Sequence, residues 1–263
     1  MSQARSESLT LHPSGAVAIT GASGGVGSAV ARALAPQAPT LVLMDRTPPE
    51  ELASELSGCR CIPIGVDIAD AAATEIALEE AAVRAGGISH LVHCAAVLRM
   101  SPVAELTAEE FEEVLRINTV AAFVLARWIA ERAVGGGGIV FISSVSGLLS
   151  GTNSLAYSAS KRALHSITQA LAIHYGEKGI RVNALCPGSM ETGIWTREVD
   201  ADMRERLGGA NARDFLESAR QESALGVLPT AEHVAELVLL LLRDAGSAVS
   251  GQIYTIWGNP LGS

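Results

Sequence analysis

The sequence is poor in aromatic residues, in basic residues and in long apolar runs. Aromatic side chains make up 4% of its 263 residues, so a folded core must be built from small, closely packed aliphatic side chains. Lys and Arg number 19 against 28 Asp and Glu, which gives a formal net charge of −9. Nucleic acid needs a basic surface for its phosphates, so this charge argues against a nucleic-acid partner.

Nothing in the sequence indicates a membrane segment. The longest aliphatic run, residues 237–242, is far too short to span a bilayer and predicts a buried helix face. The first 13 residues are polar and lack the apolar core of a signal peptide. We therefore expect a flexible tail over residues 1–13, a single domain over residues 14–263, and a cytoplasmic location.

Cysteine and histidine are present in small numbers and do not form a metal-binding pattern. The four cysteines are Cys59, Cys61, Cys94 and Cys186. No cluster with ligand spacing completes them, so we predict no metal and reduced thiols. Five histidines suggest no catalytic role and are expected to serve packing: His90, His93, His165, His174 and His233.

What the sequence does contain is a regular alternation of apolar runs and helical patterns. The apolar runs do not alternate with polar residues, which is typical of parallel strands buried on both faces. We predict strands at residues 15–20, 40–45, 61–67, 88–96, 138–144, 180–188 and 251–258. Helices are predicted at residues 25–35, 48–57, 70–85, 107–133, 154–177 and 230–243. This order predicts a single-domain, doubly wound (Rossmann) α/β fold with a parallel seven-stranded sheet and helices on both faces.

Two further features refine this organisation. Thr107 with Glu110, and more weakly Thr230 with His233, have the spacing of capping boxes at helix starts. Residues 190–225 are charged, helix-prone and without a strand, and they follow a strand at the edge where such sheets bind ligands. We expect this segment to be a substrate-binding lid.

A glycine-rich turn joins the first strand to the first helix. Its glycines, Gly21, Gly24, Gly25 and Gly27, would let backbone amides at a helix N-terminus approach a pyrophosphate, although they could also serve tight packing alone. The second strand ends in Asp45, where a carboxylate would bind ribose hydroxyls and repel a 2′-phosphate. NAD is therefore favoured over NADP, although Arg46 could accept that phosphate and Asp45 could be a simple turn residue.

Tyr157 and Lys161 lie four residues apart on a predicted helix, among Ala and Ser. Such a pair can be an ordinary exposed i, i+4 pair. Other motifs favour a different interpretation: TGASGGVG (20–27), Asp67, Asn118, ISSVSG (142–147), YSASK (157–161) and CPGSMET (186–192). In this order and spacing they resemble the short-chain dehydrogenase/reductase family over about residues 14–258.

The resemblance implies an NAD(P)-dependent enzyme that interconverts a secondary alcohol and a ketone. It implies a catalytic set of Asn118, Ser144, Tyr157 and Lys161. Ser144 is preferred to Ser143 because it stands thirteen residues before Tyr157. Tyr157 would be the general acid–base, Ser144 would hold the substrate oxygen, Lys161 would bind the nicotinamide ribose, and Asn118 would position a relay water. A free phenol has a pKa near 10, so we expect the ammonium and an oxidised nicotinamide to lower it.

The resemblance also implies a set of cofactor contacts. They are Gly21, Ser23, Gly25, Val26, Gly27, Asp45, Arg46, Asp67, Ile68, Cys94, Ala95, Tyr157, Lys161, Pro187, Gly188, Met190 and Thr192. Two stretches depart from the family. HCAA (93–96) replaces Asn-Asn-Ala-Gly, and WGN (257–259) replaces Asp-Gly-Gly, so Trp257 could pack at a subunit interface or near a site.

Two stretches, VLRM (97–100) and PGSMET (187–192) leading to Trp195, resemble 2,3-dihydro-2,3-dihydroxybenzoate dehydrogenases. The implied substrate is a carboxylated cyclic dihydrodiol, for which Arg99 and Arg197 are candidate carboxylate ligands unless they are surface residues. The rival enzyme is an NADPH-dependent 3-oxoacyl, polyketide or steroid-type ketoreductase, and a rival from another class is a catalytically silent dinucleotide sensor or scaffold. The long helices 107–133 and 154–177 favour a homotetramer or homodimer over a monomer.

Overall fold

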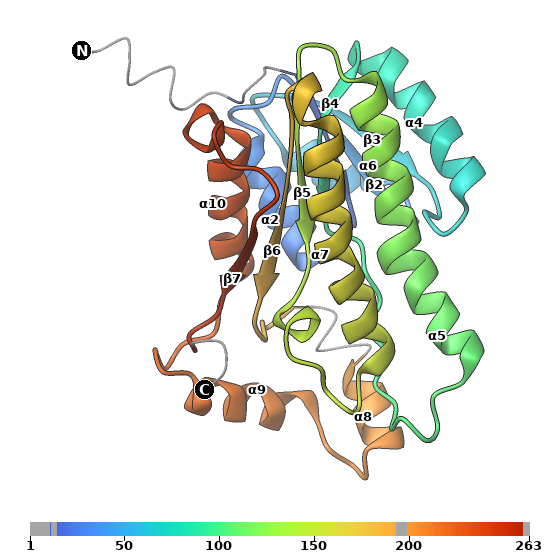
Figure 1. The fold of residues 1–263 in the computed structure, drawn as a ribbon, viewed down its shortest axis with the longest axis vertical. Helices are drawn as coiled ribbons and strands as arrows, with labels where there is room; N and C mark the ends of the chain where they lie inside the picture. The colour runs from blue at the N-terminus through green and yellow to red at the C-terminus, as the bar shows by residue number, and fades with distance from the viewer. Residues whose placement is uncertain (1–10, 12–14, 193–198, 260–263) are drawn as a thin grey trace.

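The computed structural model describes residues 11, 15–192 and 199–259, which form one sheet with helices on both sides (Figure 1). The sheet has seven strands in the order β3-β2-β1-β4-β5-β6-β7, and every neighbouring pair is parallel. The strands are β1 Ala16–Thr20, β2 Thr40–Asp45, β3 Arg60–Gly65, β4 Ile88–His93, β5 Gly137–Ile142, β6 Ile180–Pro187 and β7 Ile253–Ile256. The predicted fold class is confirmed.

Alternate residues of the strands enter two different cores. In β1, Ala16 and Ala18 join the core under α4, α6 and α7, whereas Val17 and Ile19 join the core under α2, α3 and α10. Because both faces of the sheet are covered, the strands read as continuous apolar runs. The covering helices are α2 Gly25–Leu34, α3 Glu50–Glu55, α4 Ala71–Ala85, α6 Ala121–Arg132, α7 Leu155–Tyr175 and α10 Ala231–Leu242.

The predicted helix over 107–133 is interrupted. It consists of α5 (Ala108–Leu115), a π-helical turn η1 (Arg116–Val120) and α6. The capping boxes predicted at Thr107 and Thr230 are both present. The wider turn of η1 surrounds Asn118, which is consistent with the frequent use of π-turns at functional sites.

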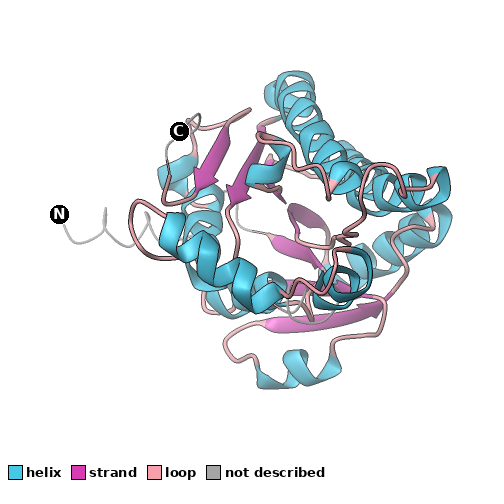
Figure 2. Ribbon diagram, turned by 90° about the horizontal axis from the view of Figure 1, so that it is seen from below, coloured by secondary structure: helices cyan, strands magenta, loops and turns pink. Residues whose placement is uncertain are grey.

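Several strands end earlier than predicted. β4 ends at His93 instead of residue 96, and β5 ends at Ile142 instead of residue 144. The residues beyond these ends leave the sheet at its carboxyl edge. There β1 lies between β2 and β4, and the direction in which the strands are added reverses. Open α/β sheets bind ligands at such a switch point. Figure 2 looks at the molecule from this end and shows helices on both sides of the sheet.

The segment predicted to be a lid folds as two helices with no strand among its described residues. They are α8 (Asp200–Arg206) and α9 (Ala212–Glu222), and both lie at the lower end of the molecule in Figure 1. Trp195 and Arg197 lie outside the described residues, as does the predicted tail except Leu11. Leu11 is buried and pairs with Arg243 in an isolated bridge.

Candidate active site

Ser144, Tyr157 and Lys161 come together from β5 and α7. Ser144 follows the end of β5 and caps a short 3-10 turn, Val145–Gly147, because its Oγ accepts a hydrogen bond from Ser146 N at 3.1 Å. Its hydroxyl also acts on the Tyr157 phenol as a hydrogen-bonding group that lowers the pKa of Tyr157. The serine that the family spacing indicates is therefore the one that lies near the phenol.

Ser143, the alternative serine, faces the interior. Its Oγ donates to the Lys161 carbonyl oxygen at 3.2 Å and lies 2.9 Å from His165 Nε2. Cys186 Sγ lies 3.3 Å from the same nitrogen, so His165 connects β6 with the end of β5. Burial lowers the pKa of His165, and the ring has a packing role.

Lys161 is buried and anchored. Its side chain is 2% exposed, and its Nζ donates to the Ile142 carbonyl oxygen at 2.8 Å. The same nitrogen lies 5.5 Å from the centre of the Tyr157 ring. The interpretation of this pair as an ordinary exposed helix pair is therefore wrong. Burial lowers the pKa of Lys161 to about 8, so an ammonium still predominates at neutral pH.

The prediction that the ammonium lowers the pKa of Tyr157 is wrong for the groups of the chain itself. Burial raises the pKa of Tyr157 to about 12, and only the hydrogen bond from Ser144 acts to lower it. The ammonium donates to the Ile142 carbonyl oxygen and lies 5.5 Å from the centre of the Tyr157 ring. Desolvation therefore outweighs any attraction between the two charged forms.

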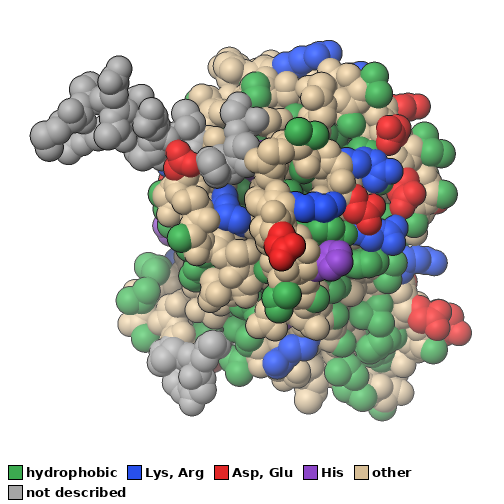
Figure 3. Space-filling model, turned by 45° about the horizontal axis from the view of Figure 1, so that its top comes forward, with side chains coloured by type: hydrophobic (Ala, Val, Ile, Leu, Met, Phe, Trp, Pro, Cys, Tyr) green, Lys and Arg blue, Asp and Glu red, His purple; other side chains and the backbone are tan. Residues whose placement is uncertain are grey.

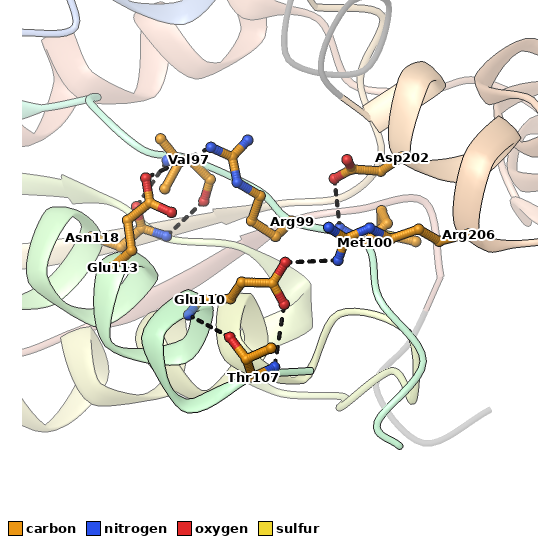
Figure 4. Close-up of polar contacts among 9 residues, drawn as sticks. All are labelled: Val97, Arg99, Met100, Thr107, Glu110, Glu113, Asn118, Asp202 and Arg206. Atoms are coloured by element: carbon orange, nitrogen blue, oxygen red, sulfur yellow. Dashed lines mark hydrogen bonds and ion pairs between the residues drawn. The ribbon is translucent and has the colours of Figure 1, made fainter. Parts of the chain in front are cut away.

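Asn118 is fully buried and its amide is used within the chain (Figure 4). Its Oδ1 accepts from Val97 N at 2.8 Å, and its Nδ2 donates to Val97 O at 2.9 Å and to Ser160 Oγ at 3.0 Å. Both amide protons are therefore used within the chain, and the positioning of a relay water by Asn118 stays a prediction. The observed contacts clamp the chain after β4 to α7.

The glycine-rich turn contains two kinds of glycine. A Cβ on Gly27 would lie 2.1 Å from Gly21 O, and a Cβ on Gly21 would lie 2.8 Å from Ala95 N, so packing within the chain requires both. Gly21 also has a positive φ of 64°. A Cβ on Gly25 would meet nothing closer than the Thr192 side chain at 3.5 Å.

Gly25 begins α2, whose N-cap Gly24 supplies no side-chain cap. The first amides of α2 are thus available to an external acceptor, and the space in front of Gly25 would be filled by any larger residue. A pyrophosphate fits both observations, since helix N-termini attract anions. The residues of the turn therefore fit a dinucleotide. Val26, the next predicted contact, is partly buried against the core.

Asp45 lies beside this turn at the end of β2. Its Oδ2 accepts from Ser23 N at 2.9 Å and its Oδ1 accepts from Arg46 N at 2.8 Å. Asp45 does serve a turn, but the same contacts fix a carboxylate next to the turn, and Arg46 is exposed. Asp67 is exposed as well, and its Oδ1 accepts from Ala69 N at 3.0 Å.

Ile68 packs into the core. Its side chain is 8% exposed and belongs to the core cluster on the α4 side of the sheet. The adenine contact of Ile68 stays a prediction. Cys94 and Ala95 follow β4 next to Gly21; Cys94 N donates to Thr20 O at 3.2 Å, and Ala95 N donates to Thr20 Oγ1 at 3.3 Å.

His93 is a site residue that the sequence analysis missed. Its Nδ1 lies 2.9 Å from Thr20 Oγ1, the hydroxyl that accepts the hydrogen bond from Ala95. The ring is fully buried, and burial lowers its pKa to about 3, with the charge of Lys161 as the smaller cause. A neutral His93 thus connects β4 to β1 beneath the dinucleotide turn. In the sequence, the departure of HCAA (93–96) from the family pattern was the signal that could have drawn attention to His93.

The far end of the predicted cleft is formed after β6. Pro187 ends this strand, and Gly188 N donates to Ile256 O at 3.0 Å. A Cβ on Gly188 would lie 2.5 Å from Trp257 Cδ1, so Trp257 covers the backbone at this point. Trp257 therefore lies beside the predicted cofactor contact Gly188, and its packing at a subunit interface or near a neighbouring site stays a prediction. Met190 packs partly on the core, and Thr192 N donates to Met190 O at 2.9 Å.

The sequence predicts no metal site and no membrane segment. Among the described residues, no group of three or more His, Cys, Asp or Glu could hold a metal ion. Within those same parts of the chain, no helix is long and apolar enough to cross a membrane. On the face shown in Figure 3, Lys and Arg side chains are interspersed with Asp and Glu and form no basic stripe.

Comparisons with known proteins agree with this geometry. A family model described as enoyl-(acyl carrier protein) reductase matches residues 21–258. L-2,3-butanediol dehydrogenase of Corynebacterium glutamicum is 29% identical over 92% of this chain and 97% of its own length. Cis-4-hydroxycyclohexanecarboxylate dehydrogenase of Sinomonas cyclohexanicum is 30% identical over 91% of this chain and 94% of its own. A dehydrogenase/reductase structure from Sinorhizobium meliloti 1021 superposes with a TM-score of 0.85 at 31% identity, covering 97% and 98% of the two chains.

Proposed function

The chain belongs to the short-chain dehydrogenase/reductase family and is an oxidoreductase of CH–OH donors with a nicotinamide nucleotide; on this premise we propose that it uses NAD to oxidise a secondary alcohol on a cyclic diol. The observation that carries the proposal is the position of the Tyr157 ring 5.5 Å from Nζ of the buried Lys161, with Ser144 acting to lower the pKa of the phenol. The first substrate to test is 2,3-dihydro-2,3-dihydroxybenzoate.

In this proposal each residue of the chain has a defined task. Tyr157 takes the alcohol proton, Ser144 donates a hydrogen bond to the substrate oxygen, and Lys161 holds the nicotinamide ribose. A nicotinamide nucleotide held by these residues would supply the hydride acceptor and, in its oxidised form, a positive charge. Since burial raises the pKa of Tyr157 to about 12, this charge is the contribution that a working phenolate needs.

The choice of NAD is supported by Asp45. Its carboxylate is fixed by Ser23 N and Arg46 N next to the glycine-rich turn, where it would repel a 2′-phosphate. An NADP site would instead need a cation at this position. Arg46 is exposed, and none of its described contacts directs it to the turn.

The choice of a cyclic diol is supported by the relatives and by the surroundings of Tyr157. One relative is named for a 2,3-diol and another for a hydroxycyclohexane ring. In this chain Tyr157 packs on a cluster of apolar residues that could contact a ring; they are Leu98, Met100, Val199, Met203, Ala212 and Leu207. Arg99, the candidate for a substrate carboxylate, lies 3.7 Å from Glu113 instead. The ring should therefore contribute more to binding than the carboxylate does.

A substrate panel tests this function. Purified protein is assayed with NAD and with NADP against cyclic dihydrodiols with and without a carboxylate, cyclohexanols, polyols, hydroxysteroids and 3-oxoacyl thioesters, with reduced nicotinamide as the readout. We expect the highest kcat/KM with NAD and a cyclic diol. Highest activity with NADPH and a 3-oxoacyl thioester would overturn the proposal.

We also propose that the protein forms a homotetramer or homodimer in the cytoplasm. Large apolar side chains are exposed on η1, α6 and α7, including Val120 at 50%, Phe123 at 38% and Ile173 at 84%. All four cysteines are free, as suits a reducing compartment. Light scattering on a sizing column tests the assembly, and a monomer at micromolar concentration would contradict it.

A further inference from the structure

The short helix α8 reaches the body of the protein through a small set of contacts. Asp202 Oδ2 accepts a hydrogen bond from Met100 N at 3.0 Å. Arg206 Nη1 donates to Glu110 Oε1 at 2.8 Å. Figure 4 shows these contacts side by side, with residues 97–100 passing between α5 and α8. Two acids and one arginine thus join a segment after β6 to a segment after β4.

A capping box with Thr107 holds Glu110 in place for this contact. Its Oε2 accepts from Thr107 N, and its own N–H donates to Thr107 Oγ1, both at 3.2 Å. The capping box therefore fixes one carboxylate oxygen and turns the other toward Arg206. The guanidinium holds the pKa of Glu110 below its usual range, and Arg99 adds a smaller contribution. A preformed acceptor reduces the entropy lost when Arg206 is ordered.

The apolar side of α8 belongs to the same apolar cluster on which Tyr157 packs. Met203 is 5% exposed and packs in one cluster with Leu98 and Met100, and Tyr157 is packed against this cluster. Asp202 and Arg206 flank Met203 in the sequence of α8. Their contacts therefore fix how closely Met203 approaches the phenol, and with it the shape of the space beside the reacting group.

We propose that Arg206 and Asp202 are positioning residues that dock α8 on Glu110 and Met100. The docking holds Met203 and Met100 as an apolar wall beside Tyr157, and this wall selects the hydrocarbon part of a neutral ring alcohol. This inference rests on the proposed function for the kind of substrate. The docking itself rests only on the described contacts. The wall would contact substrate, whereas Arg206 acts through α8.

The experiment compares Arg206→Gln with Arg204→Gln on the same helix. Arg204 pairs with Asp200 within α8, and its side chain is 67% exposed, so it is a matched control for charge and helix propensity. Glu110→Gln removes the partner charge but keeps the capping box, which accepts Gln. Each variant is assayed with the secondary alcohol that gives the highest kcat/KM in the panel, so the test holds even if that alcohol is not a cyclic diol.

We expect Arg206→Gln and Glu110→Gln each to raise KM about two- to fivefold with little change in kcat, which is the range for a partly exposed ion pair. The double variant should be no worse than either single variant, since the two residues share one contact. The KM of the wild type should rise with added NaCl, whereas that of Arg206→Gln should not. Arg204→Gln should match the wild type.

A second measurement does not depend on substrate. In Glu110→Gln, trypsin should cleave after Arg213 and Arg220 of α9 faster than in the wild type, because α8 and α9 are released together. Asp200 Oδ1 accepts from Ala212 N at 2.9 Å and couples the two helices. Equal cleavage rates together with equal KM values would overturn the docking. Faster cleavage with an unchanged preference for ring alcohols over polyols would overturn the selective wall alone and leave the proposed function intact.

Discussion

The two sides of the proposed active site are built in different ways. On the cofactor side, the site residues stand at the ends of buried strands and are fixed by main-chain contacts, such as those of Asp45 with Ser23 N and of Ala95 N with Thr20. On the substrate side, α8 is attached by two polar side-chain contacts and one small apolar cluster. The cofactor side is part of the sheet, whereas the substrate side is attached to it through side-chain contacts.

This difference indicates where changes are tolerated. A substitution on the cofactor side disturbs backbone that the core determines, so its effect should fall on chemistry, cofactor choice or stability. A substitution on the substrate side can alter how α8 sits without unfolding the sheet, so its effect should fall on KM. Loops and short helices on a rigid scaffold carry specificity in many folds for this reason.

Apart from Tyr157, the largest effect is expected at Ser144. Ser144→Ala removes the hydrogen bond to the reacting oxygens and should lower kcat by about 10²–10³-fold, as loss of one such donor does elsewhere. Ser143→Ala is the control, because that hydroxyl faces His165 and the Lys161 carbonyl. Ser143→Ala should lower the melting temperature but leave kcat close to the wild-type value. Equal losses of kcat in the two variants would show that Ser143 and Ser144 do not have the separate roles that their contacts indicate.

Asp45→Asn should change cofactor choice by about tenfold. The amide keeps an acceptor for Ser23 N but removes the charge that opposes a 2′-phosphate. The ratio of kcat/KM with NADP to that with NAD should rise about tenfold, which corresponds to about 1.4 kcal/mol. An unchanged ratio would mean that Asp45 only serves the turn.

His93→Asn should alter how stability depends on pH. Burial holds the pKa of His93 near 3, below its ordinary value of 6.5, so below pH 6.5 the unfolded chain binds a proton that the folded chain does not. The stabilising effect of a neutral His93 is complete above pH 6.5 and is lost as pH falls toward 3, at about 1.4 kcal/mol per pH unit. Urea unfolding should show the wild type losing about 2 kcal/mol more than the variant between pH 6.5 and 5. Parallel curves would contradict a neutral buried histidine.

The smallest effect is expected at Arg99. Its guanidinium already faces Glu113 at 3.7 Å, and its side chain is 33% exposed. Arg99→Ala should therefore change KM for a carboxylated dihydrodiol by less than about threefold, the range of an exposed ion pair. A much larger rise in KM, absent with the uncarboxylated diol, would restore Arg99 as a carboxylate ligand.

Much of the fold and the reacting set could be predicted from the sequence, because both depend on local patterns. Continuous apolar runs predicted the strands of the sheet, and the spacing of Ser144, Tyr157 and Lys161 predicted residues that the structure brings together. The space in front of Gly25 supports the interpretation of its turn, whereas Gly21 and Gly27 are explained by packing alone.

The parts that were not predicted depend on the third dimension. The pKa of Tyr157 follows from burial, which a sequence does not state. The side chain of Asn118 is occupied by Val97 and Ser160, and His93 is linked to Thr20, across distances in the chain that no motif encodes. The docking of α8 joins Glu110 to Arg206 in the same way. Such contacts become visible only in the folded structure.

The central claim is that the hydroxyl of Tyr157 transfers the proton next to a bound nicotinamide. Tyr157→Phe tests it most directly, with kcat measured for the best alcohol and the dissociation constant of NADH measured by fluorescence titration. The account predicts a loss of about 10²–10⁴-fold in kcat, the range for a general acid–base, and NADH binding within about twofold of the wild type. A variant that keeps a tenth or more of the wild-type kcat while binding NADH normally would contradict it.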